Sequence, residues 1–393
     1  MTLERELFDS EHEAYRQTVR KFLAKEIAPH HQQWETDQLV DRRTFEAAGA
    51  LGILGLAVPT KYGGGGETDF RFRVVVEEEI ARAGLTSFGH GIGTHDDIVL
   101  PYFVDLATEE QKVRWLPGLA QGSKIGAIAM TEPDAGSDLR ALRTTAVRDE
   151  DDWIINGQKT FISNGILADL VVVVARTHPD GGSKGFSLFV VERETEGFER
   201  GRKLEKVGRH AQDTAELAFR DVRVPGTNLL GTPGRGLAHL MERLPRERML
   251  IAVGAMAAIR AAVEWTNEFA FQSTAFGKPI GDLQNTRFVL ADMATELDVT
   301  QAFIDRAVKA LNAGTLTAVD AAKAKLWTTE LQKRVIDRCV QIFGGYGYMI
   351  EYPIARAFID SRAQTIYGGT SEIMREIIGR DIAAAHVGAG AHS

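Results

Sequence analysis

Three stretches of the chain place glycines beside hydroxyl and carboxyl side chains where turns are expected. They read GAIAMTEPDAGSDL at 126–139, QIFGGYGYMIEYPIARAFID at 341–360 and QTIYGGTSEIM at 364–374. Glycine turns let a ligand approach backbone N–H groups closely, and a helix that starts after the turn favours an anion there. Gly368 and Gly369 cannot move a proton themselves, so chemistry at this turn needs a side chain from elsewhere. Each stretch alone could also be an ordinary interdomain turn or helix cap.

The sequence lacks several other catalytic and metal-binding patterns. No G-x-G-x-x-G follows an expected strand, and there is no Walker lysine loop, G-x-S-x-G or H-E-x-x-H. Cys339 is the only cysteine, which excludes an intramolecular disulfide and a thiolate metal cluster. The ten histidines lack zinc-like spacing, so we expect no metal site. We interpret His90 with His95, and His30 with His31, as surface or helix-packing residues.

The composition allows sizeable hydrophobic cores and shows no bias toward a polyanionic partner. A length of 393 residues corresponds to two or three domains at about 150 residues each, and 44% of the residues are apolar. The 46 Lys and Arg against 54 Asp and Glu give a net charge of −8, so we expect no nucleic-acid partner. The longest aliphatic run, LVVVVA at 170–175, is far shorter than the ~20 residues that span a bilayer, so we expect no membrane contact. The acidic N-terminal stretch MTLERELFDSEHE lacks the features of a secretory or transit peptide, and we expect a cytoplasmic protein.

The hydrophobic period of the sequence changes twice and divides the chain into three predicted domains. Residues 1–125 have helical periodicity, and residues 126–235 contain short β-prone runs separated by turn residues. Within the β region, Asn156-Gly157 predicts a hairpin turn. Residues 236–393 are helical again and predict a four-helix bundle. Its helices are one through IAVGAMAAIRAAVEWTNEFAF and those at 284–313, 317–343 and 371–386. Surplus apolar surface on these helices favours association of subunits.

The first two glycine-containing stretches together resemble the signatures of the acyl-CoA dehydrogenase family. The first signature is matched by Thr131-Glu132 and Gly136-Ser137-Asp138, and the second by Gln341, Gly344-Gly345, Gly347, Glu351, Arg356 and Asp360. The segments at 107–122, 217–225, 275–284 and 366–373 extend the resemblance over nearly the whole chain. It implies an α+β multidomain fold: an N-terminal α domain, a middle β-barrel-like domain and a C-terminal four-helix bundle. This agrees with the order read from periodicity.

The resemblance also implies an activity. Enzymes of this family hold FAD and remove two hydrogens from an acyl-CoA, forming trans-2-enoyl-CoA in fatty acid β-oxidation. The segments at 202–219 and 351–374 look most like the long-chain branch, so a long-chain or branched fatty acyl-CoA is the expected substrate. Electron transfer flavoprotein is the implied electron acceptor, and a homotetramer, a dimer of dimers, the implied assembly. Alternatives within the fold are an acyl-CoA oxidase that uses oxygen and a non-catalytic DNA-binding member, against which the acidic balance and Glu247 both count.

The catalytic base is expected on the bundle rather than in the final loop. Many members carry a glutamate at the position of Gly368, whereas the long-chain and isovaleryl branches carry one at the start of the first bundle helix. Here that segment reads LPRERMLIA at 244–252, and Glu247 falls at the matching position. Pro245 predicts a helix start, which would place Glu247 in the first turn. Alternatively, Glu247 is a solvent-exposed partner of the helix dipole. Gly368 keeps its N–H, which could donate to the thioester oxygen.

The remaining site residues are assigned by the same resemblance. The alternative is ordinary turn or capping chemistry for each, except for Arg248, where it is a surface salt bridge. Flavin contacts fall on Met130, Thr131, Ser137, Phe161 and Ser163. Contacts to the adenosine and pyrophosphate of FAD across a subunit boundary fall on Gln284, Gln341, Gly344, Gly345, Thr370 and Glu372. Substrate contacts fall on Ser137, Arg248 and Gly369. The chain departs from the family at Ser273, where an arginine usually contacts FAD, and the loss of that contact would cost about 1.5–3 kcal/mol.

Overall fold

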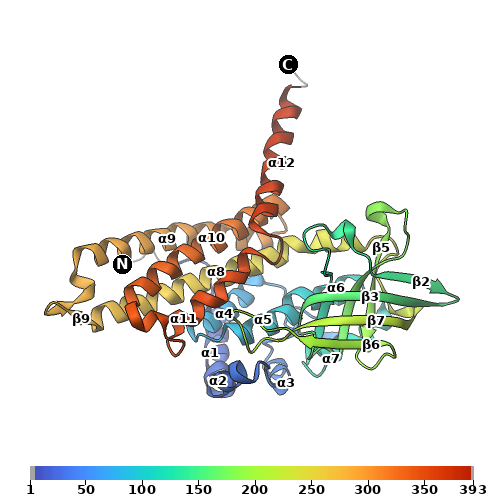
Figure 1. Cartoon of the computed structure of the whole chain (residues 1–393), viewed down its shortest axis with the longest axis horizontal. Coiled ribbons are helices and arrows are strands. Elements are labelled where there is room, and N and C mark those ends of the chain that lie inside the picture. The colour runs from blue at the N-terminus through green and yellow to red at the C-terminus, as the bar shows by residue number, and fades with distance from the viewer. Residues whose placement is uncertain (1–4, 391–393) are drawn as a thin grey trace. The chain divides into compact units, whose positions relative to one another are not determined.

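The computed structural model describes residues 5–390, with the side chains of 387–390 excepted (Figure 1). The chain packs into two compact units. The bundle unit comprises Met1–Leu23, Asp69–Thr86 and Leu244–Ser393, and the sheet unit comprises Ala24–Thr68 and Ser87–Arg243. The division falls inside the longest helix, α8 (Gly236–Gln272), between Arg243 and Leu244.

The sheet unit is built on an eight-stranded sheet with the strand order β6-β7-β3-β2-β4-β5-β8, in which β1 also pairs with β4. The strands are β1 (Gly126–Ala129), β2 (Thr145–Asp149), β3 (Asp152–Ser163), β4 (Leu170–Arg176), β5 (Phe186–Glu192), β6 (Phe198–Lys203), β7 (Thr214–Pro225) and β8 (Leu229–Leu230). β4 and β5 are almost wholly buried, which explains their continuous apolar runs. The predicted β region is therefore confirmed as a sheet.

The prediction of a hairpin turn at Asn156-Gly157 is wrong, because both residues lie inside the long strand β3. The turn between β2 and β3 instead lies at Glu150 and Asp151, where Glu150 has a φ of 54°. At Gly157 the strand carries a register irregularity and passes close to its neighbour, so that a Cβ would lie 2.5 Å from Oγ1 of Thr144. The Asn-Gly pair therefore lies at a β-bulge within the strand rather than in a turn.

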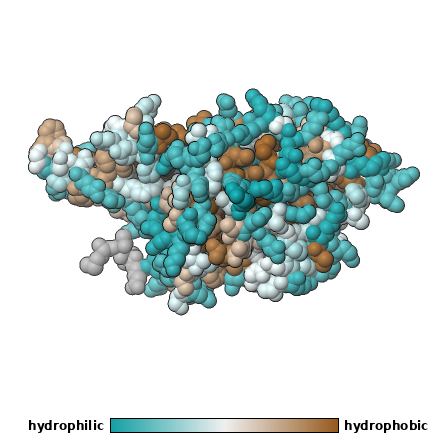
Figure 2. All heavy atoms as spheres, turned by 90° about the horizontal axis from the view of Figure 1, so that it is seen from below, coloured by the Kyte–Doolittle hydropathy of each residue, from teal (hydrophilic) through white to brown (hydrophobic). Residues whose placement is uncertain are grey.

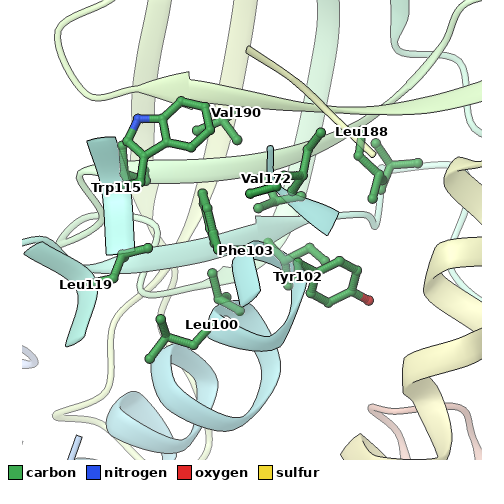
Figure 3. Packing of buried hydrophobic residues seen from close by; sticks show 14 of the residues in the cluster. Leu100, Tyr102, Phe103, Trp115, Leu119, Val172, Leu188 and Val190 are labelled. Carbon is green, nitrogen blue, oxygen red and sulfur yellow. The ribbon is translucent and has the colours of Figure 1, made fainter. Parts of the chain in front are cut away.

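Helices cover one face of this sheet and form its main hydrophobic core. They are α6 (Leu100–Leu106) and α7 (Glu109–Ala120), together with a π-helical turn at Thr94–Val99. The other helices between residues 24 and 93 of this part of the chain are α2 (Ala28–Asp37), α3 (Arg43–Ala50) and α5 (Thr86–Gly93). Figure 3 shows Tyr102 and Phe103 of α6 and Trp115 of α7 against valine and leucine side chains of β4 and β5. The rings of Phe103 and Trp115 meet edge to face with centroids 5.6 Å apart. This core fixes the sheet edge from which the loop at 130–138 leaves.

The bundle unit contains the helices that periodicity predicted. They are the C-terminal part of α8, α9 (Gln284–Asn312), α10 (Ala318–Phe343) and α12 (Ser371–Gly390), with the shorter α11 (Pro353–Ser361) and the small hairpin β9 (Thr274–Ala275) and β10 (Lys278–Pro279). Thr317 and Asp320 form a capping box that starts α10. The one cysteine, Cys339, is buried in α10 with Sγ 3.7 Å from Sδ of Met293, and burial raises its pKa to about 11.

Two helices from the N-terminal part of the chain belong to the bundle unit as well. α1 (Ser10–Phe22) and α4 (Phe70–Arg82) are joined by ion pairs, such as Arg16 Nη1 to Oε2 of Glu78 at 2.8 Å. Arg5 reaches Asp305 on α9 at 2.7 Å. The first hundred residues thus contribute to both units, which the periodicity of residues 1–125 did not indicate.

Pro245 does not start a helix, contrary to the prediction. It lies inside α8, which begins at Gly236, so Glu247 is not in a first turn and gains nothing from a helix N-terminus. A proline in a helix interior removes one backbone hydrogen bond and usually weakens the helix, but packing overrides that preference here. Met249 and Ala252 just beyond it are completely buried.

α8 is long and apolar enough to cross a bilayer by length and composition, but 78% of its most apolar window is buried inside the structure. Such burial is typical of the central helix of a bundle. Apolar side chains are exposed elsewhere on the unit, as with Phe276 of the β9–β10 hairpin, which is 92% exposed. Figure 2 shows tan and pale residues among teal ones at the bundle end that carries this hairpin. The distal part of α12, with Ile382 exposed, rises away from α9 and α10 (Figure 1).

Candidate active site

The loop that carries Gly368 and Gly369 joins a 3₁₀ turn (Arg362–Thr365) to the start of α12. Both glycines have left-handed backbones, with φ of 66° and 93°. A Cβ on Gly368 would lie 2.4 Å from Cδ1 of Ile251 on α8, and one on Gly369 would lie 2.7 Å from Cε of Met374. The loop therefore requires glycine for its conformation at both positions and for space against α8 at residue 368. The glutamate that many family members carry here would not fit this loop unchanged.

Two cations hold consecutive carbonyl groups of this loop. Nε of Arg248 donates to the carbonyl oxygen of Gly368 at 3.4 Å, and Nζ of Lys325 donates to that of Gly369 at 2.5 Å. Lys325 lies on α10 and is fully buried. Burial, helped by the positive charge of Arg248, lowers the pKa of Lys325 to about 8, while Glu330 and Glu372 oppose the shift.

Sequence reasoning missed Lys325. The available signal was its position on α10, where it falls in the buried stripe with Ala321, Ala322, Thr328 and Thr329. A lysine in such a stripe is rarely buried without a specific partner. Its partner here is a main-chain oxygen, which no pattern of side chains could have indicated.

Glu247 and Arg248 lie together on α8, and each is only 5% exposed. The reading of Glu247 as a solvent-exposed partner of a helix dipole is therefore wrong. Apolar neighbours in sequence, Met249 and Ile251, are also buried. Burial lowers the pKa of the Arg248 guanidinium, and the carboxylate of Glu247 opposes that shift. Arg248 thus contacts the Gly368 carbonyl and also interacts with the charge of the buried Glu247.

In the sheet unit, the loop after β1 is organised by the buried carboxylate of Glu132. It accepts backbone N–H groups of Arg143 at 2.6 Å and Thr144 at 2.9 Å, and the ammonium of Lys159 at 2.8 Å. Lys159 also donates to the carbonyl oxygen of Met130 at 3.0 Å. These bonds fix the backbone of the predicted flavin contacts Met130 and Thr131.

The charges of this ion pair are perturbed by burial. Burial alone would raise the pKa of Glu132, but the N–H of Arg143 and the charge of Lys159 outweigh it and lower that pKa. Burial lowers the pKa of Lys159 to about 8 despite the attraction of Glu132. The carboxylate of Glu132 is thus kept ionised by the N–H donors and the ammonium around it.

Phe161 on β3 has a backbone conformation that is unusual for an aromatic residue. Its φ is 60° and its side chain is 67% exposed. The N–H of the preceding Thr160 donates to the carbonyl oxygen of Thr131 at 2.9 Å, which keeps the two predicted flavin-binding segments side by side. A strained backbone that presents an apolar ring to its surroundings is typical of a ligand platform.

Ser163, at the end of β3, belongs to a chain of polar contacts that sequence reasoning did not anticipate. Its Oγ lies 3.4 Å from Nε2 of His90, and Nδ1 of His90 lies 2.8 Å from Nη1 of Arg209. Arginine can only donate, so Nδ1 accepts and the proton of the neutral ring is on Nε2. Burial, followed by the charges of Arg209 and Lys206, lowers the pKa of His90 well below 6.5. His95, by contrast, is a fully buried packing residue that bonds the backbone at Leu119 and Gly126.

The other predicted cofactor residues lie at element ends and are more exposed. Gln284 begins α9, Gln341 is near the end of α10, and Gly344 and Gly345 follow it. Added Cβ atoms on either glycine would meet nothing within 4 Å. Thr370 precedes α12 and its Oγ1 accepts the N–H of Ile373 at 3.3 Å. Ser137, Gln284, Gln341 and Glu372 are exposed. Their grouping around one cofactor remains a prediction.

Comparison with known proteins agrees with the resemblance at every domain. Residues 9–123, 127–222 and 234–383 match the family models for the N-terminal, middle and C-terminal domains of acyl-CoA dehydrogenases. The chain belongs to the acyl-CoA dehydrogenase family. It is 47% identical over 380 residues to the mitochondrial long-chain specific acyl-CoA dehydrogenase of Sus scrofa, covering 96% of this chain and 88% of that protein.

Solved structures of acyl-CoA dehydrogenases have the same fold. An acyl-CoA dehydrogenase from Geobacillus kaustophilus superposes with a TM-score of 0.94 at 48% identity, covering 96% of this chain and 100% of that chain. A glutaryl-CoA dehydrogenase from Mycobacterium smegmatis, solved in complex with FADH2, superposes with a TM-score of 0.90 at 29% identity over 96% of each chain. As an acyl-CoA dehydrogenase, this chain is an FAD-dependent oxidoreductase.

The residues present fit a flavin. The exposed ring of Phe161, held at a positive φ, offers an apolar surface, and the backbone of Thr131 is bonded to that of the neighbouring Thr160. Gly344 has a φ of 57° and open space where a side chain would be, as a close approach to a phosphate requires. Ser273 takes part in the β9–β10 hairpin, where its carbonyl oxygen accepts the N–H of Ile280 at 2.9 Å. It supplies no cation to a phosphate.

Proposed function

We propose that this protein oxidises long-chain fatty acyl-CoA thioesters to trans-2-enoyl-CoA with Glu247 as the catalytic base. The observation that carries the assignment of the base is that Glu247 is buried on α8 beside Arg248, whose guanidinium reaches the carbonyl of Gly368. A buried carboxylate is a suitable general base, because the protein rather than water sets its basicity. Gly368 itself, which replaces the usual acid, has no group that could do this.

The chain supplies a base, hydrogen-bond donors and a platform. Glu247 removes the proton from carbon two of the thioester, and the carbonyl oxygen of the substrate gains negative charge as the proton leaves. Backbone N–H groups of the Gly368–Gly369 loop stabilise that charge in place of water. FAD, when bound, would supply the acceptor for the hydrogen that leaves carbon three with its electron pair. Met130, Thr131, Ser137, Phe161 and Ser163 would hold its ring, with Gln284, Gln341, Gly344, Gly345, Thr370 and Glu372 around its adenosine and phosphates.

The substrate class, partners and location are further parts of the proposal. The 47% identity to a long-chain specific enzyme supports a long acyl chain. Electron transfer flavoprotein is the proposed acceptor, since the family uses it. The exposed apolar residues Phe276 and Ile382 support a homotetramer, in which subunits would cover them. We also propose a cytoplasmic location.

An anaerobic spectral titration of the purified holoenzyme tests the reaction, the cofactor and the substrate together. Acyl-CoAs of graded chain length and branching are added, and bleaching of the oxidised flavin is followed. Wild-type protein is expected to bleach most fully with long chains. Glu247→Gln should bind FAD and acyl-CoA but fail to bleach, whereas Glu264→Gln, an exposed carboxylate on the same helix, should behave as wild type. Unchanged bleaching by Glu247→Gln would place the base elsewhere.

Two further measurements separate the alternatives. Peroxide formation with acyl-CoA in air would indicate an oxidase, whereas a requirement for electron transfer flavoprotein or a dye indicates a dehydrogenase. Affinity for duplex DNA without flavin bleaching would indicate a non-catalytic member of the fold.

A further inference from the structure

Ser163 ends β3 with a hydroxyl group that has one hydrogen-bond partner in the described part of the chain. Its Oγ lies 3.4 Å from Nε2 of His90 on α5, and no other group within residues 5–390 hydrogen-bonds this oxygen. Ser163 is partly exposed, so the hydroxyl lies between the interior of the sheet unit and its surface. What the hydroxyl offers to a ligand depends on whether Oγ or Nε2 supplies the shared hydrogen.

Arg209 decides the direction of this hydrogen bond. Its Nη1 lies 2.8 Å from Nδ1 of His90. A guanidinium group only donates, so Nδ1 accepts, and a neutral imidazole then carries its one hydrogen on Nε2. The ring is neutral because burial, followed by the charges of Arg209 and Lys206, lowers the pKa of His90 well below 6.5. Nε2 is therefore the donor to Oγ of Ser163, and the hydrogen of the serine hydroxyl points elsewhere.

Without a donor at Nδ1 the same three groups could bond in the reverse sense. A neutral ring with its hydrogen on Nδ1 would accept the hydroxyl hydrogen of Ser163 at Nε2, and that hydrogen would then be lost to a ligand. Arg209 is only 8% exposed and has a φ of 52°, a left-handed backbone that is uncommon outside glycine. A buried charge and a rare backbone conformation both cost free energy, and here both occur at the residue that bonds the His90 ring.

We propose that His90 and Arg209 are positioning residues that direct the hydroxyl hydrogen of Ser163 toward the flavin ring. The donors then follow one direction, from the guanidinium through the imidazole and the hydroxyl to an acceptor atom of the ring. The inference rests on the proposed contact between Ser163 and the flavin. Hydrogen bonds in series polarise one another, so a positive charge at the start of the series makes the hydroxyl a stronger donor.

The tautomer of His90 in the wild-type holoenzyme tests the first step. In protein labelled with ¹⁵N in its histidine rings, NMR correlations to the carbon-bound ring protons show which nitrogen carries the hydrogen. The His90 signals are identified by their loss in His90→Gln. We expect the hydrogen on Nε2 in wild type and a mixture of both tautomers in Arg209→Met. A wild-type ring with its hydrogen on Nδ1, or a charged ring at neutral pH, contradicts the inference.

The principal test observes the flavin in holoenzyme that contains FAD labelled with ¹³C and ¹⁵N in its ring. Ser163→Ala should move the resonance of the contacted ring atom toward its position in an aprotic solvent, because a donor is lost. His90→Leu and Arg209→Met should move the same resonance in the same direction. His90→Gln should restore it, since an amide can accept from Arg209 and donate to Ser163. His210→Leu replaces the half-buried histidine next to Arg209 and should give the wild-type spectrum.

The double variant Ser163→Ala/His90→Leu separates positioning from general support of the fold. If His90 acts through the hydroxyl, the double variant should give the flavin resonances of Ser163→Ala alone. A further shift in the double variant would mean that His90 acts on the flavin by another route and would overturn the inference. The midpoint potential of the flavin should also become more negative in His90→Leu, because a weaker donor stabilises the electron-rich reduced ring less.

The outcomes distinguish this inference from the proposed function. If Ser163→Ala moves a ring resonance whereas His90→Leu does not, the inference is wrong and the flavin contact of Ser163 stands. If Ser163→Ala leaves every ring resonance unchanged, the proposed contact itself is wrong. Absence of flavin bleaching by any acyl-CoA in wild type would contradict the proposed reaction, which these resonances do not report. If His90→Leu fails to fold, the wild-type tautomer and the spectrum of Arg209→Met decide.

Discussion

The ammonium of Lys159 lies 2.8 Å from Oε1 of Glu132 within the sheet unit, and both side chains are almost completely buried. Loss of one partner would strand the other charge without water. Lys159→Met is therefore expected to destabilise the protein by about 3–5 kcal/mol and to lower its apparent melting temperature by roughly 5 °C. Thermal unfolding followed by tryptophan fluorescence measures this.

The double variant Lys159→Met/Glu132→Gln provides the control for that prediction. Removing both charges should cost less than the sum of the two single changes, because no unpaired charge remains. Additive effects would mean that the ion pair contributes little to stability. The backbone N–H groups that donate to Glu132 would then be what stabilises the loop after β1.

Gly368→Ala should be tolerated poorly for two separable reasons. The left-handed φ of 66° strains any side chain, and the new Cβ would meet Cδ1 of Ile251 at 2.4 Å. Ile251→Val removes that methyl group. The double variant Ile251→Val/Gly368→Ala should therefore be less destabilised than the two single variants combined, by about 1 kcal/mol. Urea unfolding of the four proteins completes the cycle, and strict additivity would show that the loop moves away from α8.

Glu247→Gln should lower kcat by about 10²–10⁴-fold, the usual contribution of a general base. FAD content and the dissociation constant for acyl-CoA should change little, since the amide has the same shape. Glu247→Asp keeps the carboxylate but withdraws it by one methylene, so it should retain more activity than the amide. Equal activities of the two variants would argue that charge at this position is irrelevant.

Arg209→Gln should raise the pKa of His90. Burial is the first cause of its low value, and Arg209 is the second, so removing the guanidinium moves the pKa back toward 6.5. In wild type the folded pKa is below the unfolded one, so folded protein binds fewer protons and loses stability as pH falls below about 6.5. This acid-induced loss should shrink in Arg209→Gln. NMR titration of the His90 ring measures this pKa. An unchanged pKa in Arg209→Gln would show that the charge of Arg209 does not act on His90.

Asp213 gives the opposite pH dependence. Burial raises its pKa from 3.8 to about 6, even though Oδ2 accepts the N–H of Ile166 at 2.6 Å. The folded protein then holds a proton that the unfolded chain has lost, so stability falls as pH rises from about 4 to 6. Asp213→Asn should flatten this slope by up to about 1.4 kcal/mol per pH unit. Asp180→Asn, an exposed residue of the same unit, should leave it unchanged.

Sequence reasoning predicted the parts of the fold that depend on long periodic segments. The helices at 284–313 and 317–343 appear as Gln284–Asn312 and Ala318–Phe343, because each has one continuous apolar face and a clear break at its ends. Predictions made from single turn or helix-start residues were less reliable. Asn156-Gly157 and Pro245 both carry strong local preferences, and in both cases packing of a longer element overrode them.

The site could be predicted only where side chains carry the signal. Glu247 was assigned because its position in a motif could be matched; its role as the base stays a prediction, with which its burial agrees. Lys325 was missed because its partner is a main-chain carbonyl. His90 was missed because its partners Ser163 and Arg209 lie 73 and 119 positions away along the chain. Contacts of that kind depend on tertiary structure, which spacing along the sequence does not encode.

The isolation of Cys339 makes the protein convenient for site-directed labelling. Its thiol is buried and poorly ionised at neutral pH, so maleimides and mild oxidants should leave the folded wild-type chain unmodified. A second cysteine engineered on the exposed β9–β10 hairpin would then be the single reactive position. A spin label or fluorophore there could report assembly of subunits in solution without a cysteine-free background.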